Sequence, residues 1–298
     1  MEHLLHHLPH IIGHSVLDTL KILPFLFLTY LLMEFLEHRS GNAAERWLRR
    51  SGTVGPIIGA LLGAVPQCGF SAAATGLYTG RIITTGTLIA LWLSTSDEML
   101  PILISEGAPL LFILKILGYK ILVGMLAGIL IDLVSRLLRN KMSAPADEPC
   151  IEEFCEREHC RCNEHFAISA LRHTLKITLF ILLFTFALNI AIEIIGEEKI
   201  AAIVLDKPIL GNVLAAFVGL IPNCASSIAL TKLYLGGIIS IGYMLSGLLV
   251  NAGVGIALLF RNNRPVLDTF RIVLILWCIG ALAGILTDLS PIAGLLTV

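Results

Sequence analysis

Residues 63–86 read GAVPQCGFSAAATGLYTGRIITTG, and residues 219–242 read GLIPNCASSIALTKLYLGGIISIG. The two stretches share Pro, Cys, Ser, Thr, Leu-Tyr, Ile-Ile and Gly residues at an offset of 156 residues. The same offset places LAGILIDL at Leu126 over LAGILTDL at Leu282, and TLKI recurs at Thr19 and Thr174 with an offset one residue shorter. Three matches in the same order along nearly the whole chain predict two copies of one structural unit.

The composition places the chain among integral membrane proteins. Of its 298 residues 56% are hydrophobic and only 14% are charged, whereas a soluble domain has roughly a quarter of its residues charged. Several apolar blocks approach the roughly 20 residues that a helix needs to cross the hydrocarbon, and others contain Gly or Pro near their middles. We therefore expect an all-α protein with whole and broken helices. The formal net charge of -1 and the lack of a basic stripe argue against a nucleic-acid partner.

Charge in the loops predicts the orientation of the two copies. Basic residues gather at 39–50, 136–172 and 261–264, whereas the segment 105–109, equivalent to 261–265, carries only Glu106. Because basic loops remain in the cytoplasm, equivalent loops lie on opposite sides and each copy crosses the membrane an odd number of times. We expect two inverted-topology repeats of about five transmembrane segments, residues 1–141 and 172–298, with broken helices at their interface. The linker 142–171 is then cytoplasmic, and both termini lie outside the inner membrane.

The repeated motif predicts a polar site inside the membrane. Pro66 frees backbone groups that lipid cannot satisfy, so they must face protein or a cavity. Alternatively, proline only kinks the helix and the small residues serve packing. In the first reading, the following side chains form a pseudo-symmetric pair at the midplane: Gln67, Cys68 and Ser71 with Asn223, Cys224 and Ser227.

The two copies differ where LSTSDEML at Leu93 aligns with LVNAGVGI at Leu249. Ionisable residues within a span indicate function by default, and their oxygen atoms suit a hard or borderline divalent cation or a proton. The alternative is that the carboxylates cap a half-helix at the membrane surface. The candidates for the substrate path are Ser94, Thr95, Ser96, Asp97, Glu98 and Asn251.

Two further clusters offer metal ligands. The linker CIEEFCEREHCRCNEHF crowds thiols and imidazoles, which suit soft or borderline metals, although their spacing matches no standard zinc finger. Its alternative is a solvated linker whose cysteines are incidental. The linker ligands are Cys150, Cys155, His159, Cys160, Cys162 and His165, and a weaker outer cluster on one helical face is His3, His7, His10 and His14.

The chain resembles a family of ten-helix heavy-metal exporters whose members are labelled manganese transporters or arsenic efflux proteins. The resemblance rests on DTLKILPFLFLTYLLMEFLEH, on VPQCGFSAAATGLYTGRIITTGTLIALWLSTSDEMLPIL, on the Cys/His-rich linker and on IPNCASSIALTKLYLGGIISIGYMLSGLLVNAGVGI. It implies a membrane exporter of metal or metalloid with five helices in each repeat.

These observations predict a secondary transporter that exports a divalent metal cation such as Mn(II), Zn(II) or Cd(II), with proton exchange through Asp97 or Glu98. No GxxxxGK[ST] loop is present to supply ATP drive, and no cofactor is expected beyond the transported or regulatory metal. Export of arsenite, transport of an organic solute and a membrane-embedded thiol enzyme using Cys68 and Cys224 are the alternatives. The sequence leaves a homodimer open.

Overall fold

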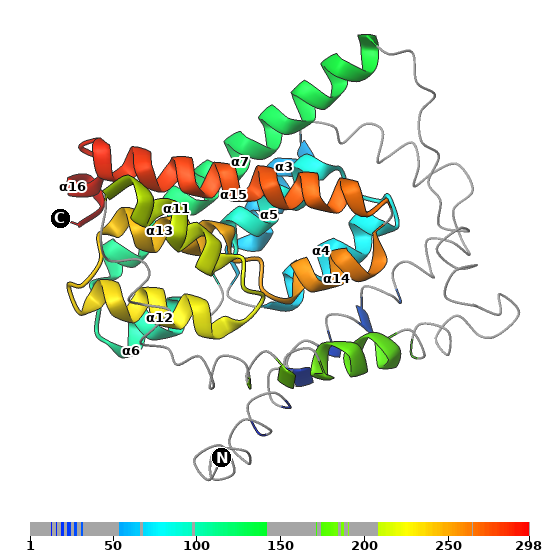
Figure 1. The fold of residues 1–298 in the computed structure, drawn as a ribbon, viewed down its shortest axis with the longest axis horizontal. Helices are drawn as coiled ribbons and strands as arrows, with labels where there is room; N and C mark the ends of the chain where they lie inside the picture. Colours follow the sequence, from blue (N-terminus) through cyan, green and yellow to red (C-terminus); the bar gives the residue numbers. More distant parts are fainter. Residues whose placement is uncertain are drawn as a thin grey trace, which may run out of the picture.

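The computed structural model describes residues 54–65, 68–96, 99–141, 174–183, 208–263 and 265–297, together with single positions between 13 and 31 and between 171 and 190. Every regular element in these ranges is a helix (Figure 1). The first half contains α3 (Val54–Gly63), α4 (Cys68–Thr79), α5 (Thr85–Ser94), α6 (Met99–Ser105) and α7 (Leu110–Lys141). The second half contains α11 (Pro208–Gly219), α12 (Cys224–Leu235), α13 (Ile241–Val250), α14 (Val254–Asn262), α15 (Val266–Leu289) and α16 (Ile292–Thr297).

The helices α3 and α4 form a hairpin around the first PQC motif. Along α3, Gly59 lies against Thr87 near the start of α5, and Gly63 lies against Leu91 near its end, so α3 and α5 run parallel. In α4 the order is reversed, because the main-chain oxygen of Ser71 lies 3.5 Å from the indole nitrogen of Trp92 near the end of α5. The chain therefore reverses between α3 and α4 instead of continuing as one kinked helix.

The second half repeats this hairpin with α11 and α12. Gly211 at the start of α11 approaches Tyr243 at the start of α13, and Gly219 at its end approaches the backbone of Gly247. The helix α12 then returns, and a short turn joins it to the start of α13 (Figure 1). In both halves glycine at the contact lets two backbones approach closely, which is the usual way that helices pack in a membrane.

Equivalent carboxylates fix the start of the two central helices. Asp132 accepts hydrogen bonds from the backbone nitrogen of Gly86 at 2.9 Å and from the hydroxyl of Thr84 at 2.6 Å. Asp288, 156 residues later, accepts the equivalent bonds from Gly242 at 3.0 Å and from Ser240 at 2.8 Å. Both aspartates thus satisfy helix donors that have no partner within the helix, which is a structural role.

The central helices are broken at equivalent points. The helix α5 ends at Ser94 and α6 begins at Met99, while α13 ends at Val250 and α14 begins at Val254. Apart from these breaks, the segments 85–105 and 241–262 are long and apolar enough to cross a membrane, as are α7 and α15. Among the residues that the structure describes, these are the four segments of sufficient length.

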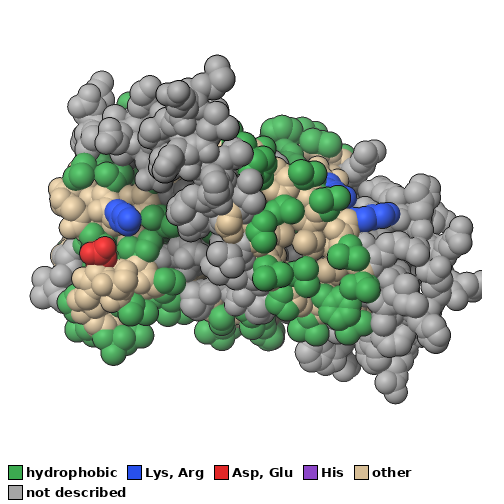
Figure 2. Space-filling view, turned by 90° about the horizontal axis from the view of Figure 1, so that it is seen from below, with side chains coloured by type: hydrophobic (Ala, Val, Ile, Leu, Met, Phe, Trp, Pro, Cys, Tyr) green, Lys and Arg blue, Asp and Glu red, His purple; other side chains and the backbone are tan. Residues whose placement is uncertain are grey.

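The outer helices present apolar side chains to the surroundings. Along α7, Leu122, Leu126 and Leu130 are each more than half exposed, and Leu282 and Leu286 on α15 are similar. Figure 2 shows hydrophobic side chains over much of the described surface, with few charged groups among them. Such a surface is unusual in a soluble protein and fits contact with lipid, so the chain is a multi-pass membrane protein.

One helix of each half packs against a helix of the other half. The helix α4 of the first half packs against α14 of the second, and α12 of the second half packs against α6 of the first (Figure 1). Ser71 lies near Gly255 at the start of α14, and Tyr78 donates a 2.9 Å hydrogen bond to Asp268 just beyond its end. The helices α4 and α14 therefore run parallel.

Candidate functional site

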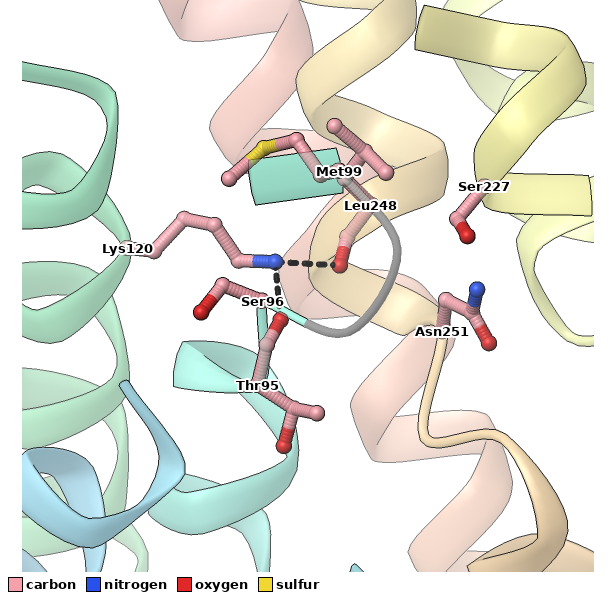
Figure 3. Close-up of a pocket in the computed structure, with 7 residues that line it drawn as sticks. All are labelled: Thr95, Ser96, Met99, Lys120, Ser227, Leu248 and Asn251. Carbon is pink, nitrogen blue, oxygen red and sulfur yellow. Dashed lines mark hydrogen bonds between the residues drawn. The ribbon is translucent and has the colours of Figure 1, made fainter. Parts of the chain in front are cut away.

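The breaks of the two central helices meet at a narrow polar pocket (Figure 3). It lies where the end of α5, the end of α13, the start of α12 and the middle of α7 come together, and side chains nearly fill it. Its lining residues are Thr95, Ser96, Met99, Lys120, Ser227, Leu248 and Asn251.

Lys120 is the charged residue of this pocket. It is 1% exposed, and among the described residues Asp132 is the other charged side chain that is buried. Its ammonium donates to the carbonyl oxygen of Thr95, just after α5, and to that of Leu248 in α13 at 2.8 Å (Figure 3). A single side chain of the first half thereby connects both central helices, one from each half.

Asn251 contributes a buried donor. The residue is 3% exposed, and its side-chain oxygen accepts a 3.0 Å hydrogen bond from the backbone nitrogen of Gly253. This bond fixes the amide, and the other end, Nδ2, has no hydrogen-bond partner among the residues that the structure describes. Because an unsatisfied buried polar group costs free energy, a donor that remains unpaired in the pocket points to a bound ligand.

The hydroxyl groups of the pocket have a different character. Thr95 donates to the carbonyl of Leu91 at 2.8 Å, Ser96 donates to that of Ala64 at 2.8 Å, and Ser227 donates to that of Cys224 at 2.8 Å. Each proton is therefore used within the protein, and the oxygen lone pairs are left to accept a hydrogen bond or to approach a cation. The pocket combines nitrogen donors with oxygen acceptors.

The equivalent place in the other half is lined by different residues. Counting 156 residues from each position, Lys120 corresponds to Leu276, Met99 to Gly255, and Leu248 to Trp92. Trp92 is fully buried and its indole nitrogen lies beside Gly255 and Ser71. A large indole thus lies beside Ser71, where the second half has the smaller Leu248 in the pocket with Ser227.

The structure brings together part of the predicted substrate path. Thr95, Ser96, Ser227 and Asn251 line the pocket, whereas the hydroxyl of Ser94 bonds to carbonyls of its own helix. The remaining described candidates do not line it. The main-chain oxygen of Ser71 lies near Gly255 in α14, Asn223 is buried at the tip of the second hairpin, and Cys224 is half-buried at the start of α12.

Other predicted residues lie outside the described part of the chain. Gln67, Asp97, Glu98, the side chain of Cys68, the linker cysteines and histidines, and the N-terminal histidines belong to this group. Within the described ranges, no three His, Cys, Asp or Glu side chains come together as a metal site.

Lys120 was not among the site residues predicted from the sequence. The signal was available in the repeat itself, because lysine stands in an apolar helix of one copy where the other copy has Leu276. A charged residue within a spanning helix indicates function by default.

A family profile described as "Putative, 10TM heavy-metal exporter" matches residues 10–185. No curated protein and no solved structure shows significant similarity to the chain.

Proposed function

Because the chain belongs to this family of ten-transmembrane heavy-metal exporters (ArsP_2), we propose that it is a secondary transporter that exports a divalent transition or heavy-metal cation of the Mn(II), Zn(II) or Cd(II) type. The observation that carries the proposal is the polar pocket at the meeting point of two equivalent broken helices. Broken helices with a site between repeats are typical of secondary transporters.

The proposed architecture has two inverted repeats, residues 1–141 and 172–298, joined by the linker 142–171. The packing of α4 against α14 and of α12 against α6 supports this architecture, as does the parallel course of α4 and α14. The helix α4 runs opposite to α5 and parallel to α14. The helix α14 continues the segment that begins with α13, so it has the same direction as α13. The equivalent helices α5 and α13 therefore run in opposite directions. The basic loops support a cytoplasmic linker and outer termini in an inner membrane.

In the proposed mechanism, oxygen atoms of Thr95, Ser96 and Ser227 approach the metal and the carboxylates of Asp97 and Glu98 exchange it for protons. The ammonium of Lys120 repels a cation, so a divalent substrate needs these carboxylates to offset that charge. The linker cysteines and histidines are proposed to bind metal before or after transport.

The test is metal flux in proteoliposomes loaded separately with Mn(II), Zn(II), Cd(II) or arsenite under a pH gradient. Asp97→Asn with Glu98→Gln is expected to lose at least 10-fold of the flux, and Glu106→Gln in the exposed turn 105–109 is the matched control that retains it. Flux of none of these probes by folded parent protein would refute metal export.

A specific observation favours a second candidate substrate, an uncharged hydroxylated metalloid such as arsenous acid. Asn251 Nδ2 is a donor and the pocket hydroxyls are acceptors, which together suit a small molecule bearing hydroxyl groups better than a bare cation. In the same assay this candidate predicts arsenite flux that does not fall in the Asp97→Asn, Glu98→Gln variant.

The family also supports transport over thiol chemistry at Cys68 and Cys224.

A further inference from the structure

The breaks in α5 and α13 leave different backbone groups without helical partners. At the end of α5, the backbone nitrogen of Thr95 donates to Trp92 O at 3.3 Å. At the end of α13, the equivalent nitrogen, that of Asn251, donates one residue further back, to Gly247 O at 3.1 Å. The carbonyl of Leu248 is thereby left for another donor, whereas that of Trp92 is not.

Two main-chain oxygens therefore point at one place. Thr95 O lies beyond the last turn of α5, and Leu248 O belongs to the last turn of α13. The carbonyl end of a helix carries partial negative charge and attracts cations. Lys120 Nζ occupies this place, bonding to both oxygens (Figure 3).

The described helices packed around Lys120 carry few titratable side chains. The helices α5 and α6 carry no titratable side chain, and α13 carries only Tyr243. The helix α12 carries Cys224, Lys232 and Tyr234. On α7, the hydroxyl of Tyr119, next to Lys120, is hydrogen-bonded to the hydroxyl of Thr287 at 2.8 Å. Asp97 and Glu98 lie outside the described residues.

From this geometry we propose that the carbonyl oxygens of Thr95 and Leu248 form a site for a monovalent cation, which the ammonium of Lys120 fills permanently. The protein then carries its own cation at the junction of its halves, and transport requires no dissolved Na⁺ or K⁺. The cation site itself rests on the contacts of Lys120, whereas the independence from Na⁺ and K⁺ rests on the proposed transport function.

The first experiment measures thermal unfolding of purified full-length protein in detergent. Lys120→Ala removes the ammonium and leaves space for propylammonium, which has the length and charge of the missing atoms. We expect propylammonium at ten times its dissociation constant to raise the Tm of this variant by roughly 4 °C. It should leave the parent unchanged.

Two matched variants separate the site from a mere cavity. Leu276→Ala opens a similar space at the equivalent position of α15, where Leu276 is fully buried, and Lys120→Met fills the space without charge. Neither should respond to propylammonium. An equal response of Lys120→Ala and Leu276→Ala, or no response of either, would overturn the cation site.

The parent supplies a test that holds even if Lys120→Ala does not fold. Flux of the transported metal should differ by less than 2-fold when Na⁺ or K⁺ is replaced by choline on both sides of the proteoliposome. A strict requirement for Na⁺ or K⁺ would overturn the built-in cation. Absence of any metal flux would instead refute the transport function and leave the unfolding experiment to decide the site.

Discussion

Ser227 and Ser71 occupy equivalent positions, yet their surroundings differ. Ser227 lies in a polar pocket beside Asn251 and Leu248, whereas Ser71 lies against Gly255 and the buried indole of Trp92. The frame around both serines is shared: each precedes a threonine that donates to its carbonyl, at 2.8 Å for Thr75 and 2.7 Å for Thr231. The difference teaches that the repeated residues build a shared scaffold, whereas substituted neighbours such as Trp92 and Leu248 give the two serines different surroundings.

The shared part of the frame is most sensitive at the glycine contacts. Gly219→Ala would push a methyl group into the backbone of Gly247, and Gly63→Ala would push one into Ser94 and Leu91 O. Because the backbone cannot yield cheaply, we expect each to lower the free energy of unfolding by about 2–3 kcal/mol. Thermal unfolding in detergent measures this. Gly118→Ala, with open space around its added carbon, is the control that should not destabilise.

The carboxylate caps should respond similarly in both halves. Asp132→Asn weakens two charge-assisted hydrogen bonds at the start of α5. Asp288→Asn weakens the two equivalent bonds at the start of α13 and a third bond, from Asn212 on α11. We expect each to cost about 1.5–2 kcal/mol, with metal flux per folded molecule retained. Unfolding and flux are measured on the same preparations. If one variant lost flux selectively while remaining folded, its aspartate would belong to the transport path and not to the frame.

A change confined to the pocket should alter selectivity with less effect on stability. Asn251→Asp replaces the unpaired donor by a carboxylate oxygen. We expect the ratio of Cd(II) to arsenite flux to rise about 10-fold, equivalent to roughly 1.4 kcal/mol, because the carboxylate attracts the cation and offers no donor to the metalloid. Competition flux in proteoliposomes gives the ratio directly. An unchanged ratio would place the substrate away from Asn251.

The sequence predicted much of the frame. The repeat and the membrane class follow from the 156-residue offset and from hydropathy, and the helical membrane fold is confirmed. Broken helices were also predicted, but the central helices break between Ser94 and Met99 and between Val250 and Val254, away from Pro66 and Pro222. The reversal of α3 into α4 was not predicted, because a proline within an apolar block fits a kink as well as a hairpin.

The site was predicted only in part. Thr95, Ser96, Ser227 and Asn251 were found from their motifs, whereas the contacts of Lys120 depend on where α7 crosses the ends of α5 and α13. That crossing is a tertiary feature with no local sequence signal. The roles of Asp97, Glu98 and the Cys/His linker stay predictions, since these residues lie outside the described ranges.

The central claim is that substrate binds on the Ser227 side of the pseudo-symmetric interior. Its most direct test compares metal flux by Ser227→Ala and Ser71→Ala in proteoliposomes, at metal concentrations below saturation. Each variant removes one hydroxyl from an equivalent and buried position. We predict a loss of about 10-fold for Ser227→Ala and of less than 2-fold for Ser71→Ala, since only the first oxygen faces the pocket. Equal losses, or a larger loss for Ser71→Ala, would contradict the account.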